Sequence, residues 1–246
     1  MSDPLFFGCL AGVTVGGLLH LDGADGRHAA KVRRIRVGEQ VLVADAEGRA
    51  IRGVTQLVGA DFIDVRVDEC LREPGQEHWW TVVQALAKGG RDEQAVEAMT
   101  ELGVDAVVAW QASRSVVQWH GAEKQAKGLA KWQSTVREAA KQSRRFRVPN
   151  VACVTSTSDV CKCIRAAAQA FVLHESASEF LDTQALVSSG EVLFIVGPEG
   201  GITPDELEAF EAAGAKPVLI ADHVLRTSTA GVVALAQLQT MARAAS

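Results

Sequence analysis

The chain has 246 residues, of which 48% are hydrophobic and 22% charged, and its formal net charge is −5. This length allows one large domain or two modest ones, with enough apolar sequence for a real core. The negative charge excludes a globally basic nucleic-acid coat. The scarcity of aromatic residues (5%, with no tyrosine) argues against an extended stacking platform for single strands. The five cysteines contain no Cys-x-x-Cys pair, which argues against a zinc site or a disulfide framework and favours a reducing cytoplasm.

The N-terminal segment 4–21 is apolar but does not have the pattern of a signal peptide. It lacks a positively charged start, since Asp3 precedes it, and glycines interrupt it at four positions: Gly8, Gly12, Gly16 and Gly17. We therefore expect strands and turns of a folded domain here. No stretch of ~20 uninterrupted apolar residues follows anywhere, so we expect no membrane-spanning helix and a cytoplasmic protein.

The first seventy residues predict a small domain of short strands. Apolar runs at 39–45, 50–58 and 62–67 follow one another at hairpin spacing, and the last of them alternates apolar and polar residues. This pattern favours a small antiparallel barrel or sandwich. Segment 72–77 contains Pro74 and Gly75 and is the expected linker. We therefore divide the chain into domains 1–73 and 74–246.

The second domain alternates strands with helices. Buried-strand candidates lie at 79–86, 106–110, 171–173, 192–196 and 217–221, and helical patterns lie at 91–102, 123–143 and 204–213, with a last helix ending near residue 242. Strands that alternate with helices predict a parallel sheet with crossover helices, which is an α/β domain.

Positive charge is concentrated in segment 114–147. Nine Lys or Arg residues and two Glu give this segment a charge of +7, so the rest of the chain sums to −12. A basic face on an acidic protein suggests a dock for phosphates, although a solvated helix face is the plain alternative. The arginines of Arg144-Arg-Phe-Arg147 are the best candidates, because the guanidinium group binds phosphate in a bidentate manner.

A glycine-rich loop, Gly197-Pro-Glu-Gly-Gly201, follows the predicted strand 192–196. Thr203, Pro204 and Glu206 then form an N-capping box with proline at the first helical position, and Gly214 ends that helix. Loops at the carboxyl ends of strands bind ligands in this fold class. The carboxylate of Glu199 disfavours a triphosphate and favours a ligand that is neutral or cationic near this loop. The alternative is that the loop is a purely structural turn.

Two further loops are expected at the same edge of the sheet. His174-Glu175-Ser176 follows strand 171–173, and residues 222–226 follow strand 217–221. Arg226 directly precedes a helix start, where a cation is unfavourable for the helix dipole, so a functional or ion-pairing role is indicated. His174 alone is more often a packed or capping residue than a catalyst. Three loops on one edge predict a pocket.

Several motifs, in this order and spacing, resemble the bacterial 16S ribosomal RNA (uracil-N3) methyltransferases of the SPOUT class. The motifs are His28-x-x-x-Val32-x-Arg34 with Gly38, Ala85-Leu-x-Lys88-Gly89, Glu101-Leu-Gly-Val104, Ser113-Arg-Ser-Val-Val117, Glu138-Ala139 with Gln142-Ser143-x-Arg145, Val148-Pro149, Gly197 to Gly201, and Leu225-Arg-Thr227 with Thr229-Ala230. The resemblance runs almost from end to end.

This resemblance implies a PUA-like β-barrel that binds RNA, followed by an α/β domain with a parallel sheet and a trefoil knot. It also implies a homodimer that uses S-adenosylmethionine to methylate N3 of a uridine in the decoding region of 16S rRNA, within the small ribosomal subunit and without a metal. The chain departs from the family pattern at Arg33, at Ile220-Ala221, at Ser228, and near Phe6-Phe7, where an Arg-x-Phe pattern is missing. Ser228 replaces a glutamate near the expected pocket.

The resemblance and the loops together give candidate site residues. Arg145 and Arg226 are expected to stabilise the anion of deprotonated uracil, and Glu199 to act as a base or to contact the cofactor. The expected cofactor-binding residues are Leu173, His174, Glu175, Gly197, Pro198, Glu199, Gly200, Gly201, Ile220, Leu225, Arg226 and Ser228. The expected RNA-binding residues are His28, Arg34, Lys88, Arg114, Arg144, Arg145 and Arg147.

Two other functions remain open on the sequence. A non-enzymatic RNA-binding factor for ribosome assembly would use the same basic face with a degenerate pocket, and the departures at Ser228 and Ala221 favour it. A ribose 2′-O-methyltransferase of the same fold is the other alternative, which the order of the motifs disfavours.

Overall fold

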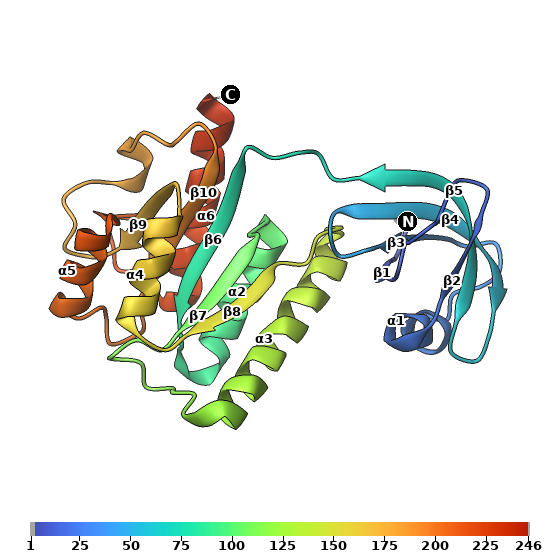
Figure 1. Cartoon of the computed structure of the whole chain (residues 1–246), viewed down its shortest axis with the longest axis horizontal. Helices are drawn as coiled ribbons and strands as arrows, with labels where there is room; N and C mark the ends of the chain where they lie inside the picture. The colour runs from blue at the N-terminus through green and yellow to red at the C-terminus, as the bar shows by residue number, and fades with distance from the viewer. Residues whose placement is uncertain (1–2, 246) are drawn as a thin grey trace. The chain divides into compact units, whose positions relative to one another are not determined.

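A computed structural model describes residues 3–245 of the chain (Figure 1). The chain divides into two compact units. The first comprises Met1–Gly75 together with Ala140–Val148, and the second comprises Gln76–Ala139 and Pro149–Ser246. The basic segment Ala140–Val148 thus groups with the N-terminal unit, although it follows residue 74 in the sequence. Within residues 3–245, every helix is too short or too polar to cross a membrane.

The first unit is a curled five-stranded sheet (Figure 1). Its strands are β1 (Leu5–Phe7), β2 (Leu18–Leu21), β3 (Gln40–Ala44), β4 (Arg49–Val58) and β5 (Ile63–Arg72), in the order β1-β3-β4-β5-β2. The hairpins β3-β4 and β4-β5 are antiparallel as predicted, and β2 pairs with β5 in the same way. The expectation of a wholly antiparallel sheet is wrong at one edge, because β1 pairs with β3 in parallel. Helix α1 (Gly23–Arg27) and the π-helix η1 (His28–Val32) separate β2 from β3, so β1 and β3 are not joined by a hairpin.

Both faces of this sheet bury apolar residues. One face carries the main core, with alternating residues such as Val41, Val43 and Ile51. The other face packs Leu42 and Ala44 against residues of the 140–148 segment, namely Ala140, Phe146 and Val148. Packing of buried Ala140 and half-buried Phe146 and Val148 against this face explains why the segment belongs to the first unit.

The second unit contains a six-stranded parallel sheet, which confirms the predicted architecture. Its strands are β6 (His78–Ala85), β7 (Ala106–Trp110), β8 (Asn150–Val154), β9 (Gln169–Leu173), β10 (Gly190–Val196) and β11 (Lys216–Val218), in the order β11-β9-β10-β6-β7-β8. All the pairings are parallel. The central strands β10 and β6 are almost fully buried, as expected of near-continuous apolar runs. The trefoil knot implied by the resemblance stays a prediction.

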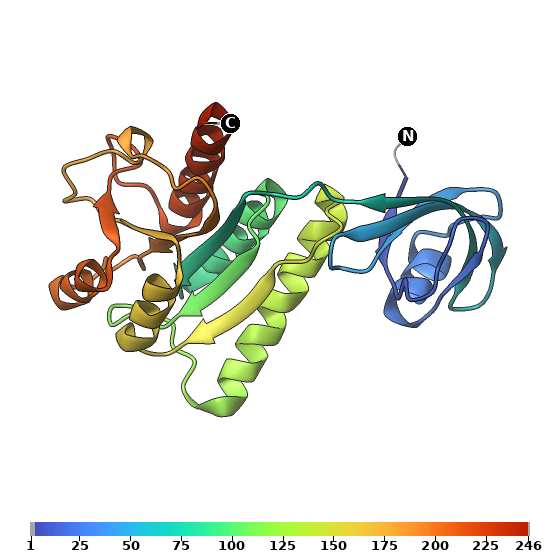
Figure 2. The same ribbon diagram turned by 45° about the horizontal axis from the view of Figure 1, so that its top comes forward.

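Helices cover both faces of this sheet. They are α2 (Arg91–Leu102), α3 (Gly121–Ser143), α4 (Thr157–Ala166), α5 (Pro204–Ala213) and α6 (Thr227–Ala245), with short 3₁₀ turns η2 (Lys88–Gly90) and η3 (Leu181–Thr183). In Figure 2 the helices α2 and α6 lie on one side of the sheet, and α4 and α5 lie on the other. The capping box of α5 is confirmed at Thr203 and Glu206, and Gly214 ends the helix in the left-handed conformation.

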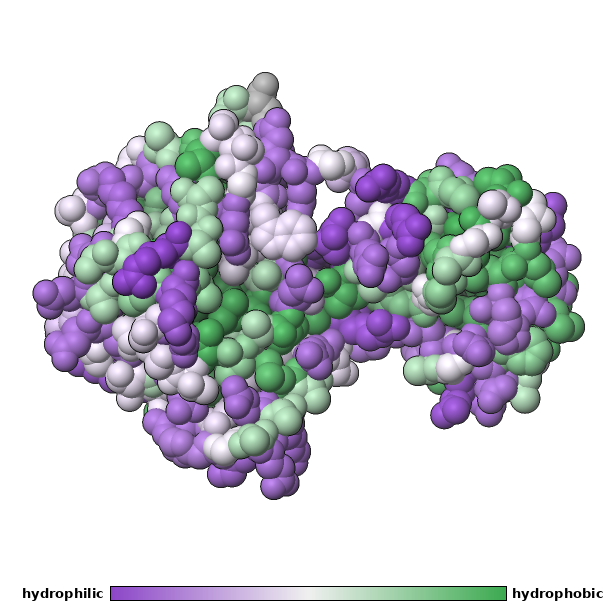
Figure 3. All heavy atoms as spheres, viewed as in Figure 1, coloured by the Kyte–Doolittle hydropathy of each residue, from purple (hydrophilic) through white to green (hydrophobic). Residues whose placement is uncertain are grey.

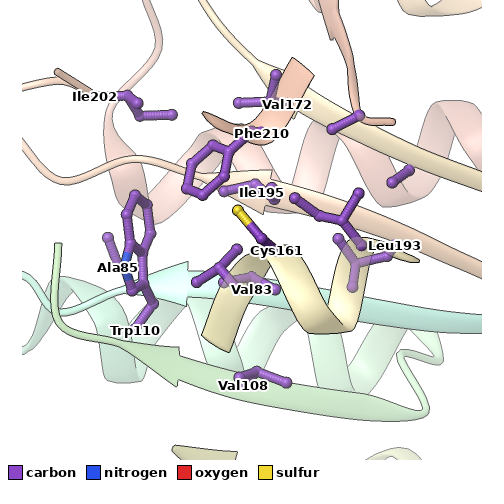
Figure 4. Packing of buried hydrophobic residues seen from close by; sticks show 14 of the residues in the cluster. Val83, Ala85, Val108, Trp110, Cys161, Val172, Leu193, Ile195, Ile202 and Phe210 are labelled. Atoms are coloured by element: carbon purple, nitrogen blue, oxygen red, sulfur yellow. The ribbon is translucent and has the colours of Figure 1, made fainter. Parts of the chain in front are cut away.

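The core under α4 and α5 is mostly aliphatic and contains one aromatic pair (Figure 4). Trp110 and Phe210 meet edge to face with ring centroids 5.3 Å apart, and Cys161 lies beside them.

An apolar surface lies over part of the same sheet. In Figure 3 apolar residues gather over the sheet between α4 and α3, with hydrophilic residues bordering them. The edge strand β8 contributes to this apolar surface, since all its residues are exposed or half-buried.

Candidate functional site

A cavity of about 430 Å³ opens at the carboxyl ends of β9, β10 and β11. The three loops expected at this edge all line it. Every predicted cofactor-binding residue except Ser228 is among the lining residues, which include Leu173, His174, Glu175, Gly197, Pro198, Glu199, Gly200, Gly201, Ile220, Leu225 and Arg226. Ser228 lies in the first turn of α6 and is not among them. The volume is in the range of small-ligand sites, ~300–1,000 Å³.

The glycine loop approaches its neighbours too closely for side chains. A Cβ on Gly200 would lie 2.9 Å from the Cβ of Arg114, and Gly201 has a φ of +74°. Arg114 is held over this loop, because its Nη1 donates to the carbonyl oxygen of Gly200 at 3.2 Å. Arg114, predicted as an RNA-binding residue, therefore lines the cavity.

A chain of hydrogen bonds anchors the start of the glycine loop. The Nε2 of fully buried Gln84, at the end of β6, donates to the Thr227 hydroxyl at 2.9 Å. That hydroxyl donates in turn to the carbonyl oxygen of Gly197 at 2.9 Å. The first residue of α6 thus connects β6 to the loop after β10, and this connection fixes one wall of the cavity.

Glu199 connects the glycine loop to the loop after β6. Its Oε1 accepts the backbone N–H of Lys88 at 3.2 Å and forms an ion pair with Nη1 of Arg91 at 3.3 Å. Arg91 is a lining residue that the sequence did not single out. Nothing in the sequence signals Arg91, since it simply begins a helix.

Glu206 joins two more loops of the site from a buried position. Its Oε1 accepts the backbone N–H of Ser113 at 2.8 Å, and its Oε2 accepts the N–H and the hydroxyl of Thr203 at 2.9 and 3.0 Å. Burial by itself raises the pKa of Glu206, but the hydrogen bonds from Ser113 and Thr203 outweigh it and lower the pKa below its ordinary value. The carboxylate therefore stays ionised and keeps Arg114, the residue after Ser113, next to the glycine loop.

The other two loops also bring polar groups to the lining of the cavity. His174 is engaged locally, because its Nδ1 lies 2.7 Å from the Ser176 hydroxyl. Glu175 and Asp222 add carboxylates to the lining. Asp222 and His223 were missed by sequence reasoning, although they lie in the loop that it identified.

The remaining predicted residues divide between the two units. Arg226 lines the cavity and is exposed, and Lys88 lies on the loop that Glu199 holds. His28, Arg34, Arg144, Arg145 and Arg147 belong to the first unit. His28 packs edge-on against Phe6, with ring centroids 6.1 Å apart, so its ring has a structural contact.

Arg34 and Arg144 have left-handed backbones, with φ values of 54° and 60°. Such φ values are uncommon for residues other than glycine and lower the stability of the fold.

Among residues 3–245, no group of three or more His, Cys, Asp or Glu side chains is arranged to hold a metal ion.

Comparison with known proteins matches the chain to two families. The RNA methyltransferase PUA domain family matches residues 21–68, and the RNA methyltransferase domain family matches residues 75–239. The chain is 46% identical over 224 residues to ribosomal RNA small subunit methyltransferase E of Mycobacterium bovis, covering 89% of this chain and 85% of that protein. It is 29% identical to the protein of the same name from Bacillus subtilis, covering 89% and 88%.

A solved structure has the same fold over nearly the whole chain. The ribosomal RNA small subunit methyltransferase E of Neisseria gonorrhoeae, bound to S-adenosylmethionine, superposes with a TM-score of 0.85 at 26% identity and covers 98% of both chains. The family match, the identity and the common fold extend over both units. The chain therefore belongs to the ribosomal RNA small subunit methyltransferase E family, with an N-terminal PUA domain followed by an RNA methyltransferase domain.

Proposed function

We propose that this protein transfers a methyl group from S-adenosylmethionine to N3 of a uridine in the decoding region of 16S rRNA, within the small ribosomal subunit. The observation that carries the proposal is the cavity formed by the glycine loop and its two neighbouring loops, in a chain of this family. The intact cavity disfavours the alternative of a non-enzymatic assembly factor with a degenerate pocket. The departure at Ser228 leaves the lining unchanged, because Ser228 is not a lining residue.

The cavity's residues fit S-adenosylmethionine. A cationic sulfonium and an ammonium group call for nearby negative charge, and Glu175 and Asp222 supply carboxylates, whereas the charge of Glu199 is paired with Arg91. Gly200 and Gly201 bring bare backbone to the wall, and the side chain of Arg114 fills the space beside Gly200. Leu173, Ile220 and Leu225 add apolar lining for an adenosine. When bound, the cofactor supplies an electrophilic methyl group.

We assign the electrostatic role to Arg226. Uracil N3 carries a proton, and its loss leaves an anion that a nearby cation stabilises. Arg226 is exposed at the cavity, and within residues 3–245 its side chain has no ion pair of 4.0 Å or shorter, so its charge is available to a substrate. Arg145 is kept as a candidate for the same role and for RNA contact.

Glu199 has a supporting role in this proposal. Since its Oε1 is already engaged by Lys88 and Arg91, the carboxylate orients the loop and balances the charge of Arg91. Holding both reactants in place contributes much of the rate in transfers of this kind.

The proposal is tested by methylation of small subunits that lack the modification, with wild type and Arg226→Ala. Tritiated S-adenosylmethionine reports the transfer, and nucleoside digestion identifies the product. We expect N3-methyluridine from wild type, and a rate reduced about 10²–10³-fold in the variant with cofactor binding retained. A protein that neither binds the cofactor nor methylates any ribosomal RNA would contradict the proposed enzyme activity. The assembly factor would then be the remaining alternative.

A matched substrate separates the two methyltransferase chemistries. RNA that already carries a 2′-O-methyl group on the target uridine should still be methylated by an N3 enzyme, whereas a ribose methyltransferase would be blocked. The proposal also includes a homodimer, from the family resemblance, and a cytoplasmic location, which the pattern of cysteines favours. Light scattering on the purified protein tests the dimer.

A further inference from the structure

A second cavity, of about 340 Å³, lies in the same unit and is not used by the proposed cofactor site. It is formed by the start of α2, the first half of α3 and the loops before them. Its lining comprises Ala87, Gly89, Gly90, Asp92, Glu93, Val117, Trp119, Lys124, Lys127, Gly128 and Lys131. The cavity therefore combines an indole ring with three lysines spaced along one face of α3.

The indole ring of Trp119 is held in a fixed position. A Cβ on Gly128 would lie 2.3 Å from this ring, so the ring packs directly on the bare backbone of α3. Its other support is the buried Trp132, which it meets edge to face with ring centroids 5.7 Å apart. The backbone N–H of Trp119 donates to Oε1 of Gln111 at 2.8 Å. Trp119 is half-buried and lines the cavity, so part of a rigid aromatic surface is open to a ligand.

The charges around the ring leave two lysines available. Lys131 forms an ion pair with Glu93, with Nζ 2.5 Å from Oε1. Asp92 is buried and accepts the N–H groups of Ala87 and Glu93 at 3.1 and 2.9 Å, so it serves the local backbone. Lys124 and Lys127 are exposed and form no ion pair within residues 3–245. The cavity is therefore positive on the side that α3 provides.

The second cavity is next to the proposed cofactor site. Residues 88–91 form the partition, because Gly89 and Gly90 line the second cavity and Arg91 lines the first. Glu199 holds this partition through Lys88 and Arg91. An extended ligand strand that crosses residues 88–91 reaches both cavities.

We infer that the second cavity is a nucleotide subsite for single-stranded RNA, in which one base stacks on Trp119 and the adjoining phosphates contact Lys124 and Lys127. An aromatic ring beside lysines is the combination that binds single strands without reading their sequence. The scarcity of aromatic residues excludes an extended platform, but one base requires one ring. This inference rests on the proposed function for its substrate, since the bound nucleotide would flank the methylated uridine.

The direct test measures binding of a fluorescein-labelled oligouridylate to the full chain in the absence of cofactor. We expect Trp119→Ala and Gly128→Ala to bind about 5- to 100-fold more weakly, and Trp119→Phe to bind nearly as well as wild type. The double variant Lys124→Ala/Lys127→Ala should bind more weakly and lower the slope of log K against log salt by about 1.4. The matched control, Lys162→Ala/Lys216→Ala, removes two exposed lysines of the same unit that are paired with Asp159 and Glu179, and should leave the affinity unchanged.

Two further readouts make the outcome decisive. The Trp119→Phe variant should lose most of the tryptophan quenching that RNA causes in wild type, which places the base on this ring even if Trp119→Ala fails to fold. On small subunits, the lysine variant should raise KM while the Kd for S-adenosylmethionine is unchanged. Equal oligouridylate affinity for wild type, Gly128→Ala and the lysine variant would overturn the subsite. A loss of affinity in the lysine variant alone, with none in the Trp119 and Gly128 variants, would overturn it too. RNA binding with this pattern but without methyl transfer would instead reject the proposed function and retain the subsite.

Discussion

The buried carboxylate of Glu206 accepts the backbone N–H of Ser113 at 2.8 Å and thereby joins the helix after β10 to the loop after β7. Its second oxygen caps the helix that begins after Thr203. One side chain thus completes a capping box and sets the position of Arg114, which leans over the glycine loop. The site depends on contacts that are remote in sequence.

Replacing this carboxylate by an amide should destabilise the protein. In Glu206→Gln one carboxylate oxygen becomes an NH₂ group that faces a backbone donor, so a buried hydrogen bond is lost at a cost of about 1–3 kcal/mol. Because the folded pKa of Glu206 is lowered, its stabilisation is complete above the unfolded value of 4.5 and is lost as the pH falls through the lower folded value. Urea unfolding of both proteins at pH 7 and below pH 4.5 should show a difference that shrinks in acid. A difference independent of pH would contradict this role.

Removing the hydroxyl of Thr227 should loosen the glycine loop. Thr227→Val leaves the carbonyl oxygen of Gly197 and the amide of Gln84 without this partner, at a cost of about 1–3 kcal/mol. We expect lower stability in urea and weaker binding of S-adenosylmethionine by calorimetry. Thr229→Val is the matched control, since Thr229 is exposed on the same helix and should leave both quantities unchanged. Equal cofactor affinity for Thr227→Val and wild type would show that the link does not hold the cavity.

A methyl group on Gly200 should disturb the cavity without straining the backbone. The added Cβ would lie 2.9 Å from the Cβ of Arg114, so Arg114 must move, at a cost of about 1–3 kcal/mol. We expect Gly200→Ala to lower cofactor affinity about 5- to 100-fold in calorimetric titration. The control is Gly75→Ala, where no atom lies within 4 Å of the added Cβ. If both variants bind the cofactor like wild type, the glycine loop is a structural turn only.

Arg144 should reveal a conflict between stability and RNA binding. It follows the last residue of α3 with a φ of 60°, and the Arg145 N–H returns to the carbonyl oxygen of Ala140 at 2.9 Å, which is the helix ending that normally uses glycine. Arg144→Gly should be about 1–2 kcal/mol more stable than Arg144→Ala in urea, because only glycine adopts this angle freely. Both variants should bind RNA equally weakly, since both lack the guanidinium group. Wild-type RNA affinity in both would exclude Arg144 from the RNA-binding residues.

The sequence predicts the parallel sheet well, because its buried strands are nearly continuous apolar runs bounded by helical patterns. Helix α2 and the capping box of α5 are also predicted at their observed residues. Strand β8 is missed although residues 151–154 are a short apolar run, since a run of four residues does not by itself distinguish a strand from a helix or a loop. Helix α4 is missed although Ser156 caps it by accepting the N–H of Asp159, and the Ser-x-x-Asp spacing was a signal for it.

The sequence predicts the site residues that lie in one continuous loop. It misses those whose part in the site depends on contacts with residues distant in the sequence. The glycine loop and the Leu225-Arg226 segment are recognisable as local motifs, so their residues were found. Arg91 lines the cavity and pairs with Glu199, and Gln84 acts on the site through Thr227. Such pairings across more than one hundred positions have no local pattern in the sequence.

The identity of the methylated nucleoside tests the proposed function most directly. Small subunits that lack the modification are incubated with the protein and S-adenosylmethionine carrying a labelled methyl group, and the rRNA is digested to nucleosides and separated by chromatography with mass detection. We predict that the label appears in N3-methyluridine and that Arg226→Ala lowers its rate of formation about 10²–10³-fold. Label in a 2′-O-methylated nucleoside, or no label in any nucleoside although the protein binds the cofactor and the subunit, would contradict the proposal.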